Sequence, residues 1–169
     1  ADELMASCCS NLYGLHATGL RFFTVYGPWG RPDMAPMLFA KAIVNGEPVK
    51  VFNGGDLLRD FTYVDDIVEG VCLVANKQPQ SSGNRHSIYN IGCSNPIKLT
   101  DFISILEDAL GQKAERQMLP MQPGDVYQTY ADTTALERDF GYRPQTNLQE
   151  GIHRFVEWFS EYKDKLGLV

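Results

Sequence analysis

The pattern of apolar and polar residues is clearest at the end of the chain, where it predicts a long amphipathic helix. Asn147, followed by Glu150 three positions later, forms a capping-box pattern, and apolar residues then recur every three or four positions. The apolar stripe consists of Leu148, Ile152, Phe155, Phe159, Tyr162 and Leu166. We expect this stripe to pack against the core, because one continuous apolar face is typical of a surface helix.

Glycines mark the ends of three other predicted helices. A glycine directly after an apolar-periodic segment adopts, at little cost, the left-handed conformation that ends a helix. These helices lie at 4–13 before Gly14, at 36–45 before Gly46 and at 100–110 before Gly111, with Thr100 as the expected N-cap. We also expect helices over 64–76 and 134–140.

Short runs of β-branched and aromatic residues, bounded by glycine or proline, predict the strands. They lie at 20–26, 49–52, 59–63, 87–91 and 117–119. Residues 77–86 are the most loop-like part of the chain, and Pro123-Gly124 predicts a turn. Because the strands alternate with helices, the predicted fold class is α/β or α+β, and the sequence indicates no repeat and no second domain.

With 169 residues, of which 44% are apolar and 21% charged, the chain has the composition of one soluble domain. A chain of this size hides roughly two thirds of its unfolded surface, so it needs neither disulfides nor a metal to fold. The formal net charge of −6 argues against a nucleic-acid-binding surface, which needs clustered Lys and Arg, but a few placed cations suffice for a small anion. No apolar stretch approaches the roughly 18 residues that span a membrane.

The four cysteines lack the paired spacing of zinc or redox sites. Cys8, Cys9, Cys72 and Cys93 are predicted to be buried, reduced thiols in a cytoplasmic protein. The three histidines are scattered along the chain, so we expect no metal site.

Motifs that would make the chain catalytic by itself are absent from its sequence. It contains no Gly-x-Gly-x-x-Gly, no Walker-type phosphate loop, no Gly-x-Ser-x-Gly and no His-Glu-x-x-His. It opens on Ala1 without an initiator methionine, and its first residues have the pattern of a helix interior. We therefore expect a piece of a longer protein that holds no catalytic residue itself.

Two arginines, one in a predicted loop and one at the start of a predicted extended segment, are the best candidates for binding an anion. Arg31 lies between Pro28 and Pro32, which restrict the backbone, and Arg59 stands shortly before a predicted helix. A guanidinium offers planar bidentate donors to phosphate or carboxylate. For each arginine the alternative is an ordinary exposed ion pair. At 122–125 an amide and a carboxylate share a turn, which suits ribose hydroxyls or turn formation alone.

Three motifs follow one another in an order that one enzyme family shares. They are LRFFTVYGPWGRPDM at 20–34, RDFTYVDDI at 59–67, and MQPGDV at 121–126 followed by YAD at 130–132. Together they resemble the extended short-chain dehydrogenase/reductases of the NAD-dependent epimerase/dehydratase family, whose members act on nucleotide sugars. The resemblance covers nearly the whole chain, and the first motif is most similar to that of UDP-glucuronate 4-epimerases.

The resemblance implies an α/β fold in which residues 1–169 form the carboxyl-terminal, substrate-binding half of a Rossmann-type epimerase. In that family the amino-terminal half binds NAD, and a Tyr-x-x-x-Lys helix supplies the acid and base, with the lysine placed just before Ala1. By resemblance, the intact enzyme is a cytoplasmic homodimer that uses NAD and a UDP-sugar. This chain alone is expected to hold no NAD and to be inactive.

Residue by residue, the resemblance implies a binding site for a UDP-sugar. It assigns the sugar carboxylate to Thr24 and Arg31, the uracil to Phe52, the diphosphate to Arg59, and the ribose hydroxyls to Asp125 with its neighbour Gln122. Phe22 and Pro28 match positions near the nicotinamide, and plain core packing is the alternative for Phe52. The chain departs from many relatives at Gln122, where they have arginine.

The leading hypothesis is therefore an epimerase that interconverts UDP-glucuronate and UDP-galacturonate through a 4-keto sugar. UDP-glucuronate decarboxylases and sugar 4,6-dehydratases share the scaffold, but they usually carry asparagine at the position of Thr24. An alternative from another class is a non-catalytic nucleotide-sugar-binding or dimerisation module. Surface that the other half normally covers would be exposed in this chain, so we expect self-association or binding of the missing half.

Overall fold

The computed structural model describes residues 1–77 and 85–167. Within these residues the chain forms six α-helices, one short 3-10 helix and seven strands, which confirms the predicted α/β class. The helices are α1 (Asp2–Tyr13), α2 (Ala35–Asn45), η1 (Asn53–Gly55), α3 (Val64–Asn76), α4 (Leu99–Leu110), α5 (Thr134–Phe140) and α6 (Leu148–Tyr162). The strands are β1 (Ala17–Phe22), β2 (Thr24–Tyr26), β3 (Val49–Phe52), β4 (Leu58–Tyr63), β5 (His86–Ile91), β6 (Pro96–Lys98) and β7 (Arg116–Leu119).

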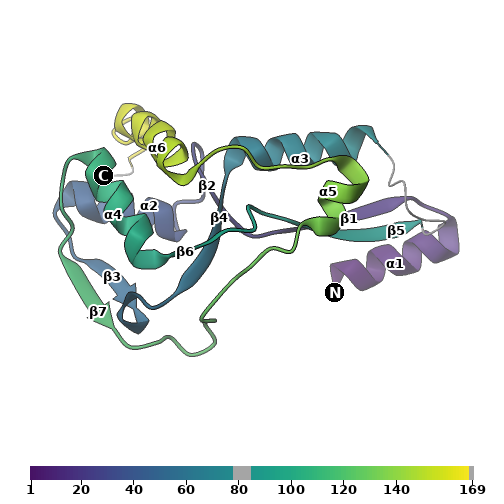
Figure 1. The fold of residues 1–169 in the computed structure, drawn as a ribbon, viewed down its shortest axis with the longest axis horizontal. Coiled ribbons are helices and arrows are strands. Elements are labelled where there is room, and N and C mark those ends of the chain that lie inside the picture. The colour runs from purple at the N-terminus through teal and green to yellow at the C-terminus, as the bar shows by residue number, and fades with distance from the viewer. Residues whose placement is uncertain (78–84, 168–169) are drawn as a thin grey trace.

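The molecule is elongated, and its elements gather at two ends (Figure 1). At one end lie α1, α5, β1 and β5, and at the other lie α2, α4, α6, β3 and β7. Strand β4 crosses the region between them, and α3 leads from it back toward the first end. The predicted helix ends are confirmed at Gly14, Gly46 and Gly111, each of which has a left-handed backbone with φ of 67–68°.

Three small sheets hold the strands together. β1 pairs in parallel with β5, β4 lies between parallel β2 and antiparallel β6, and β3 pairs in parallel with β7. The predicted strand at 20–26 is two strands, because the chain leaves β5 after Phe22 and joins β4 at Thr24. Between them, Phe23 donates its N–H to the carbonyl of Ile91 at 3.2 Å. One extended segment therefore connects the two ends of the molecule.

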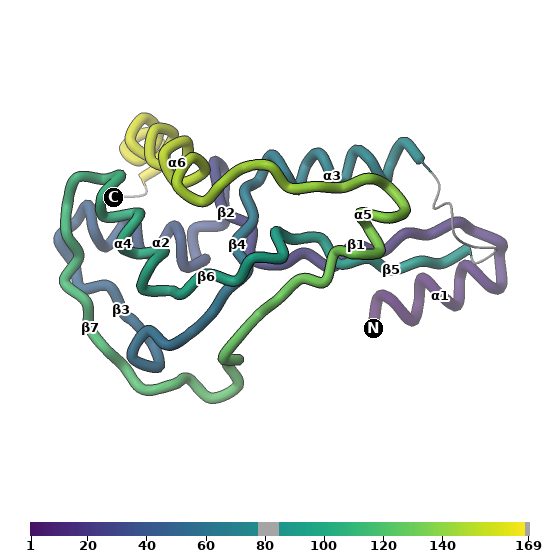
Figure 2. Tube along the Cα trace, in the orientation of Figure 1, coloured from purple at the N-terminus to yellow at the C-terminus, as the bar shows by residue number. Residues whose placement is uncertain are grey.

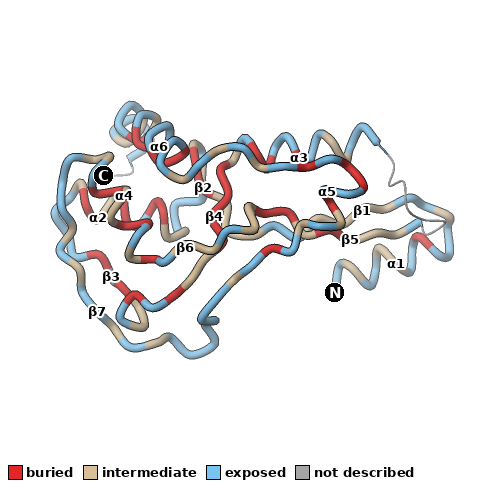
Figure 3. Tube along the Cα trace, in the orientation of Figure 1, coloured by how far each residue is buried: buried red, intermediate tan, exposed pale blue. Residues whose placement is uncertain are grey.

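Two hydrophobic clusters stabilise the two ends. The larger one joins aromatic side chains of β2, β4, α4 and α6, and within it the rings of Phe61 and Phe102 stack with 4.2 Å between centroids. The smaller cluster consists of Ile67, Tyr89, Ile91, Leu136, Phe140 and Tyr142. Helix α1 contributes to neither, and Ser10 is its single buried residue (Figure 3).

Helix α6 confirms most of its sequence prediction. The side chain of Asn147 accepts the N–H of Glu150 at 2.9 Å, as an N-cap should. The Glu150 carboxylate bonds Arg154 instead of completing the capping box. The predicted stripe is wrong for Leu166, which is 46% exposed because the helix ends at Tyr162.

Helix α4 begins one residue earlier than predicted. Lys98 occupies the N-cap position without a side-chain hydrogen bond, so the expectation that Thr100 caps this helix is wrong. Thr100 lies in the first turn, and its carbonyl accepts the hydroxyl of Ser104 at 2.9 Å. The helix starts at Leu99 because β6, a strand that the sequence did not predict, pairs with β4 up to Lys98 and Leu99 then bonds Leu57.

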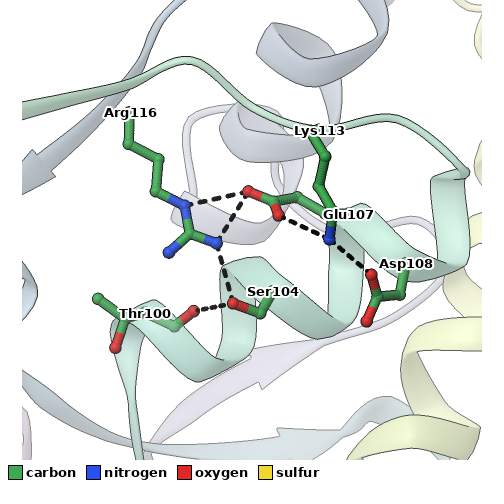
Figure 4. A network of polar contacts seen from close by, with 6 residues as sticks. All are labelled: Thr100, Ser104, Glu107, Asp108, Lys113 and Arg116. Carbon is green, nitrogen blue, oxygen red and sulfur yellow. Dashed lines mark hydrogen bonds and ion pairs between the residues drawn. The ribbon is translucent and has the colours of Figure 1, made fainter.

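A buried carboxylate connects the end of α4 to β7 (Figure 4). Glu107, whose side chain is 4% exposed, accepts hydrogen bonds from Nε and Nη2 of Arg116 at 3.0 and 2.8 Å. Lys113 lies 3.3 Å from the other Glu107 oxygen, and Arg116 also donates to Ser104 at 2.9 Å. This network fixes the start of the extended segment that leads from β7 toward α5 (Figure 2).

The cysteines are more exposed than predicted. Cys8, Cys9 and Cys72 are exposed and Cys93 is half-buried, all as free thiols, so the expectation of buried thiols is wrong for the first three. The two in α1 point outward because that helix turns its small residues toward the sheet. Of the predicted loop at 77–86, residues 78–84 lie outside the described part of the chain. Within the described ranges, no helix is long and apolar enough to cross a membrane, and no cluster of His, Cys, Asp and Glu is placed to hold a metal.

Candidate functional site

A cavity of about 570 Å³ lies among β2, α2, β3 and β4. Its walls are mainly apolar side chains of α2, β3 and β4, and a small number of polar groups line it as well. The polar and aromatic lining includes five residues that the sequence predicts to bind a UDP-sugar, namely Thr24, Phe52, Arg59, Gln122 and Asp125. Side chains from four distant parts of the sequence therefore meet in one apolar cavity with convergent polar groups, which is the usual form of a small-molecule site.

Arg59 faces this cavity from β4, and it is only 15% exposed. Its Nη2 donates to Oδ1 of Asp125 at 2.6 Å, and its Nη1 donates to the carbonyl of Leu58 at 3.0 Å. Arg59 therefore forms an ion pair, but not an ordinary exposed one, because its partner is a second residue of the same cavity, 66 positions away in the sequence. The pair holds one edge of the guanidinium in a fixed direction.

Asp125 and Gln122 belong to the turn that the sequence predicts. The N–H of Asp125 donates to the carbonyl of Gln122 at 3.2 Å across Pro123 and Gly124, and Gly124 has a φ of 85°. The turn is tied to β4, because the carbonyl of Tyr127 accepts the N–H of Leu58 at 2.9 Å. The turn therefore keeps a fixed place beside Arg59.

Phe52 and Thr24 line the cavity from the ends of two short strands. Phe52 is the last residue of β3, is half-buried and packs against the larger hydrophobic cluster. The alternation of β3 also places Lys50 on the cavity, two residues before Phe52. The sequence prediction missed this cation, although its period-two spacing from Phe52 was visible in the sequence. Thr24 begins β2, where it pairs with Phe61.

The structure does not bring Arg31 into this cavity. Arg31 lines a second cavity of about 380 Å³ together with Phe22 and Pro28, the two residues predicted near a nicotinamide. Its Nε donates to Asp33 at 3.1 Å, and the Nη2 contacts the other oxygen of the same carboxylate. This hydrogen bonding holds the pKa of Asp33 below its usual value. Sequence reasoning missed this partner, which stands only two positions from Arg31.

The two cavities meet at the loop that carries Arg31. Asp33 lines the larger cavity, and Met34 lines both. The backbone of the loop is closely packed: a Cβ on Gly27 would lie 2.7 Å from Val64, so only glycine fits there. The loop therefore holds Arg31 next to the larger cavity without placing its side chain in that cavity.

Comparison with known proteins gives the family. Residues 1–92 match the family model described as the NAD dependent epimerase/dehydratase family, which is more than half of the 169 residues. The chain belongs to this family. The match contains the first two motifs, at 20–34 and 59–67, and confirms the family that the resemblance indicated.

Individual relatives agree with this assignment. UDP-glucuronate 4-epimerase 2 of Arabidopsis thaliana is 45% identical over 96% of this chain and 40% of its own length. The crystal structure of a UDP-glucuronic acid 4-epimerase from Bacillus cereus, in complex with UDP-glucuronic acid and NAD, superposes with a TM-score of 0.86 at 30% identity, over 94% of this chain and 50% of that one. DesIV, a dTDP-glucose 4,6-dehydratase from Streptomyces venezuelae, superposes with the same TM-score of 0.86 at 27% identity, over 99% of this chain and 51% of that one. The chain spans about half the length of the curated relatives it matches.

Proposed function

We propose that this chain is the UDP-sugar-binding portion of an NAD-dependent nucleotide-sugar 4-epimerase that interconverts UDP-glucuronate and UDP-galacturonate. One observation carries the proposal: the larger cavity gathers an aromatic ring, a fixed guanidinium and a turn with an amide and a carboxylate. This set matches the parts of a nucleoside diphosphate, with Phe52 for the base, Arg59 for the diphosphate, and Asp125 with Gln122 for the ribose hydroxyls.

For the sugar we propose Thr24 and Arg31 as the residues that hold its carboxylate. Arg31 would exchange the carboxylate of Asp33 for that of the ligand, and the two anions offer the same bidentate acceptor. Oxidation at C4 places a ketone β to the sugar carboxylate, which favours decarboxylation. Donors that fix the carboxylate oppose this loss, so the pair suits an epimerase.

The cofactor is proposed for the intact enzyme and not for this chain alone. In the intact enzyme, bound NAD would supply the hydride-accepting and hydride-donating chemistry at C4 of the sugar. Phe22, which is 53% exposed, and Pro28 offer an apolar wall that fits a nicotinamide ring in the smaller cavity. We assign residues 1–169 to the substrate-binding part, and we place the cofactor-binding Rossmann half and the catalytic tyrosine and lysine outside this chain. On that assignment the chain alone is inactive.

Helix α1 exposes apolar side chains that another part of the intact enzyme would cover. Leu4, Met5, Leu12 and Tyr13 are between 60% and 77% exposed on this helix. We propose that the amino-terminal half, or a second copy in a homodimer, covers them in the intact enzyme. Sedimentation of this chain tests the proposal: concentration-dependent association supports it, and a monodisperse monomer contradicts it.

A sugar 4,6-dehydratase is the second candidate, and the superposition with DesIV supports it. UDP-glucuronate decarboxylase is the other alternative within the family, and the resemblance of Thr24 to the epimerases weighs against both. A non-catalytic nucleotide-sugar-binding module differs from all three in lacking turnover even when the cofactor-binding half is supplied. The nucleobase separates the leading candidate from the dehydratase, because DesIV acts on a dTDP-sugar.

Calorimetric titration of the chain with UDP and with dTDP tests the proposed function. We expect UDP to bind, dTDP to bind more weakly, and Arg59→Ala to lower the UDP affinity by about tenfold or more, because a charged hydrogen bond to phosphate is lost. The matched control is Arg143→Ala, which removes an exposed arginine paired with Glu137 at 2.8 Å away from the cavity. Failure of UDP to bind, or equal losses in the two variants, contradicts the proposal.

A further inference from the structure

Asp60 is a fully buried carboxylate that none of the roles above uses. It is 0% exposed and stands next to Arg59 in β4. Each of its oxygens accepts one backbone N–H: Oδ1 from Cys93 at 2.9 Å and Oδ2 from Ala131 at 2.9 Å. A buried carboxylate costs free energy unless hydrogen-bond donors compensate its charge. Asp60 therefore needs both of these bonds to remain buried.

The same stretch of β4 holds the segment that follows the Asp125 turn. The backbone N–H of Asp60 donates to the hydroxyl of Thr129 at 3.0 Å. Two residues earlier, the carbonyl of Leu58 accepts the N–H of Thr129 at 3.1 Å. The N–H of Leu58 donates to the carbonyl of Tyr127 at 2.9 Å. Leu58 and Asp60, two positions apart in β4, therefore attach residues 127–131 to this strand. Arg59 lies between them, and its side chain bonds Asp125.

The surroundings leave this attachment little freedom. A Cβ on Gly92 would lie 2.5 Å from that of Ala131 and 3.4 Å from that of Phe23, so the three backbones approach as closely as they can. Tyr142 donates its hydroxyl to the carbonyl of Gly92 at 3.2 Å and closes the other side. The distance from Ala131 to β4 is thus set by packing and by Asp60 together.

We propose that Asp60 is a positioning residue: its carboxylate fixes the segment 122–131 along β4 and so sets the place of Asp125 and Gln122 relative to Arg59. The inference rests on the proposed function for the meaning of that site, because the segment then carries the ribose contacts. Asp60 touches no ligand in this account and acts through Asp125.

Asp66 provides a natural control within the same chain. It is 5% exposed, and its two oxygens accept the N–H groups of Gln145 at 3.0 Å and Thr146 at 3.1 Å. The arrangement is the same, but it joins α3 to the segment before α6 and touches no residue of the larger cavity. If Asp60 only stabilised the fold, its substitution and that of Asp66 would have similar effects on the segment 122–131 and on UDP affinity.

The first experiment needs no ligand. Asp60→Asn and Asp66→Asn each turn one acceptor into an NH₂ group that faces an N–H, so each removes one bond without changing side-chain size. Hydrogen exchange of the whole chain is then followed by mass spectrometry. We expect amides of 122–131 to exchange about tenfold faster in Asp60→Asn and to keep their rates in Asp66→Asn.

The second experiment measures UDP affinity by calorimetry. We expect Asp60→Asn to weaken UDP about tenfold and Asp66→Asn to change it by less than about twofold. Asp125→Ala should weaken UDP in the native background but add little in the Asp60→Asn background, because both changes remove the same contact. If Asp60→Asn does not fold, Thr129→Val keeps both carboxylate bonds, removes the acceptor of the Asp60 N–H, and should weaken UDP about threefold.

The outcomes separate the two proposals. If the native chain does not bind UDP, the proposed function fails, and the exchange rates of 122–131 still decide whether Asp60 positions that segment. If UDP binds but the two Asn variants weaken it equally, or if exchange in 122–131 does not respond to Asp60→Asn, the inference about Asp60 is overturned. Additive effects of the Asp60 and Asp125 substitutions would overturn it as well.

Discussion

Arg59 and Asp125 lie 2.6 Å apart, Nη2 to Oδ1, although 66 residues separate them in the sequence. Asp125 uses the same oxygen to accept the N–H of Val126 at 2.8 Å. The carboxylate therefore partly neutralises the cation that we assign to the diphosphate. A ligand that brings hydroxyl donors for Asp125 and an anion for Arg59 satisfies both groups, whereas a bare anion meets the carboxylate as a competitor.

This relationship predicts opposite responses of two ligands to Asp125→Asn. Pyrophosphate should bind about threefold more tightly, because the competing negative charge is gone. UDP should bind about threefold or more weakly, because the acceptor for its ribose hydroxyls is weakened. Titration calorimetry of both ligands on the native chain and the variant measures the difference, and a change of the same sign for both would contradict it.

The local features of the fold could be predicted from the sequence because they depend on neighbouring residues. The ends of α1, α2 and α4 follow from single glycines, and the turn that carries Asp125 follows from Pro123-Gly124. The order of three motifs was sufficient to identify the family. For the same reason, residues that the motifs carry, Arg59 and Asp125 among them, could be predicted to lie together in one cavity.

Features that depend on a distant partner could not be predicted in the same way. The break at Phe23 exists because β1 pairs with β5 and β2 pairs with β4, and nothing within 20–26 encodes that change of partner. Strand β6 begins at Pro96 and forms because β4 offers it an edge. The two bonds of Asp60 join β4 to residues more than thirty positions away, so its burial was invisible in the local pattern.

Arg31 and Asp33 should affect sugar selectivity in opposite directions. In the chain joined to its cofactor-binding half, Arg31→Ala is expected to weaken UDP-glucuronate far more than UDP-glucose, because only the former carries the carboxylate. Asp33→Asn should strengthen UDP-glucuronate a few-fold, on the order of the value of an exposed ion pair, and leave UDP-glucose unchanged. Dissociation constants of both sugars measure this, and equal losses with the two ligands would refute the role of Arg31.

The Glu107 network predicts how stability depends on pH. Burial raises the pKa of Glu107, but hydrogen bonds from Arg116 and Lys113 outweigh it, so the pKa lies below the ordinary value of 4.5. A carboxyl whose pKa is depressed by folding stabilises the native state above its unfolded pKa. That stabilisation is lost as the pH falls from about 4.5 through the lower folded pKa.

Urea unfolding between pH 7 and pH 3 therefore tests the network. Arg116→Ala should cost about 2 kcal/mol at pH 7, because it leaves a buried carboxylate with Lys113 as its remaining charged partner, and Glu107→Gln should flatten the acid decline. Asp108→Asn is the control, since that side chain is 73% exposed and pairs with the exposed end of Lys113. An acid decline as steep in Glu107→Gln as in the native chain would rule out this origin.

Close packing of α6 on β2 predicts a large effect at Gly151. A Cβ there would lie 2.1 Å from the hydroxyl oxygen of Tyr26 and 2.8 Å from its Cζ. Gly151→Ala should destabilise the chain by about 2–3 kcal/mol, and Tyr26→Phe in the same chain should recover part of that loss by removing the nearest atom. Thermal unfolding of both single variants and the double variant checks this, and simple additivity would show that the contact is not the cause.

The two tryptophans of the chain, Trp29 and Trp158, touch each other. The ring centroid of Trp29 lies 5.4 Å from that of Trp158 and 5.1 Å from that of Tyr162, so α6 supports the loop that carries Arg31. Trp29 is 66% exposed and has a φ of 59°, a conformation that costs a bulky residue about 1–3 kcal/mol and that these ring contacts offset.

Release of Arg31 from Asp33 by a ligand should therefore change tryptophan emission. In the chain joined to its cofactor-binding half, with tryptophans of that half replaced, UDP-glucuronate should shift the emission, and UDP, which lacks the carboxylate, should not. Trp29→Phe should abolish the response while leaving the emission of Trp158. Equal responses to both ligands, or a response that persists in Trp29→Phe, would mean that the loop does not follow the carboxylate.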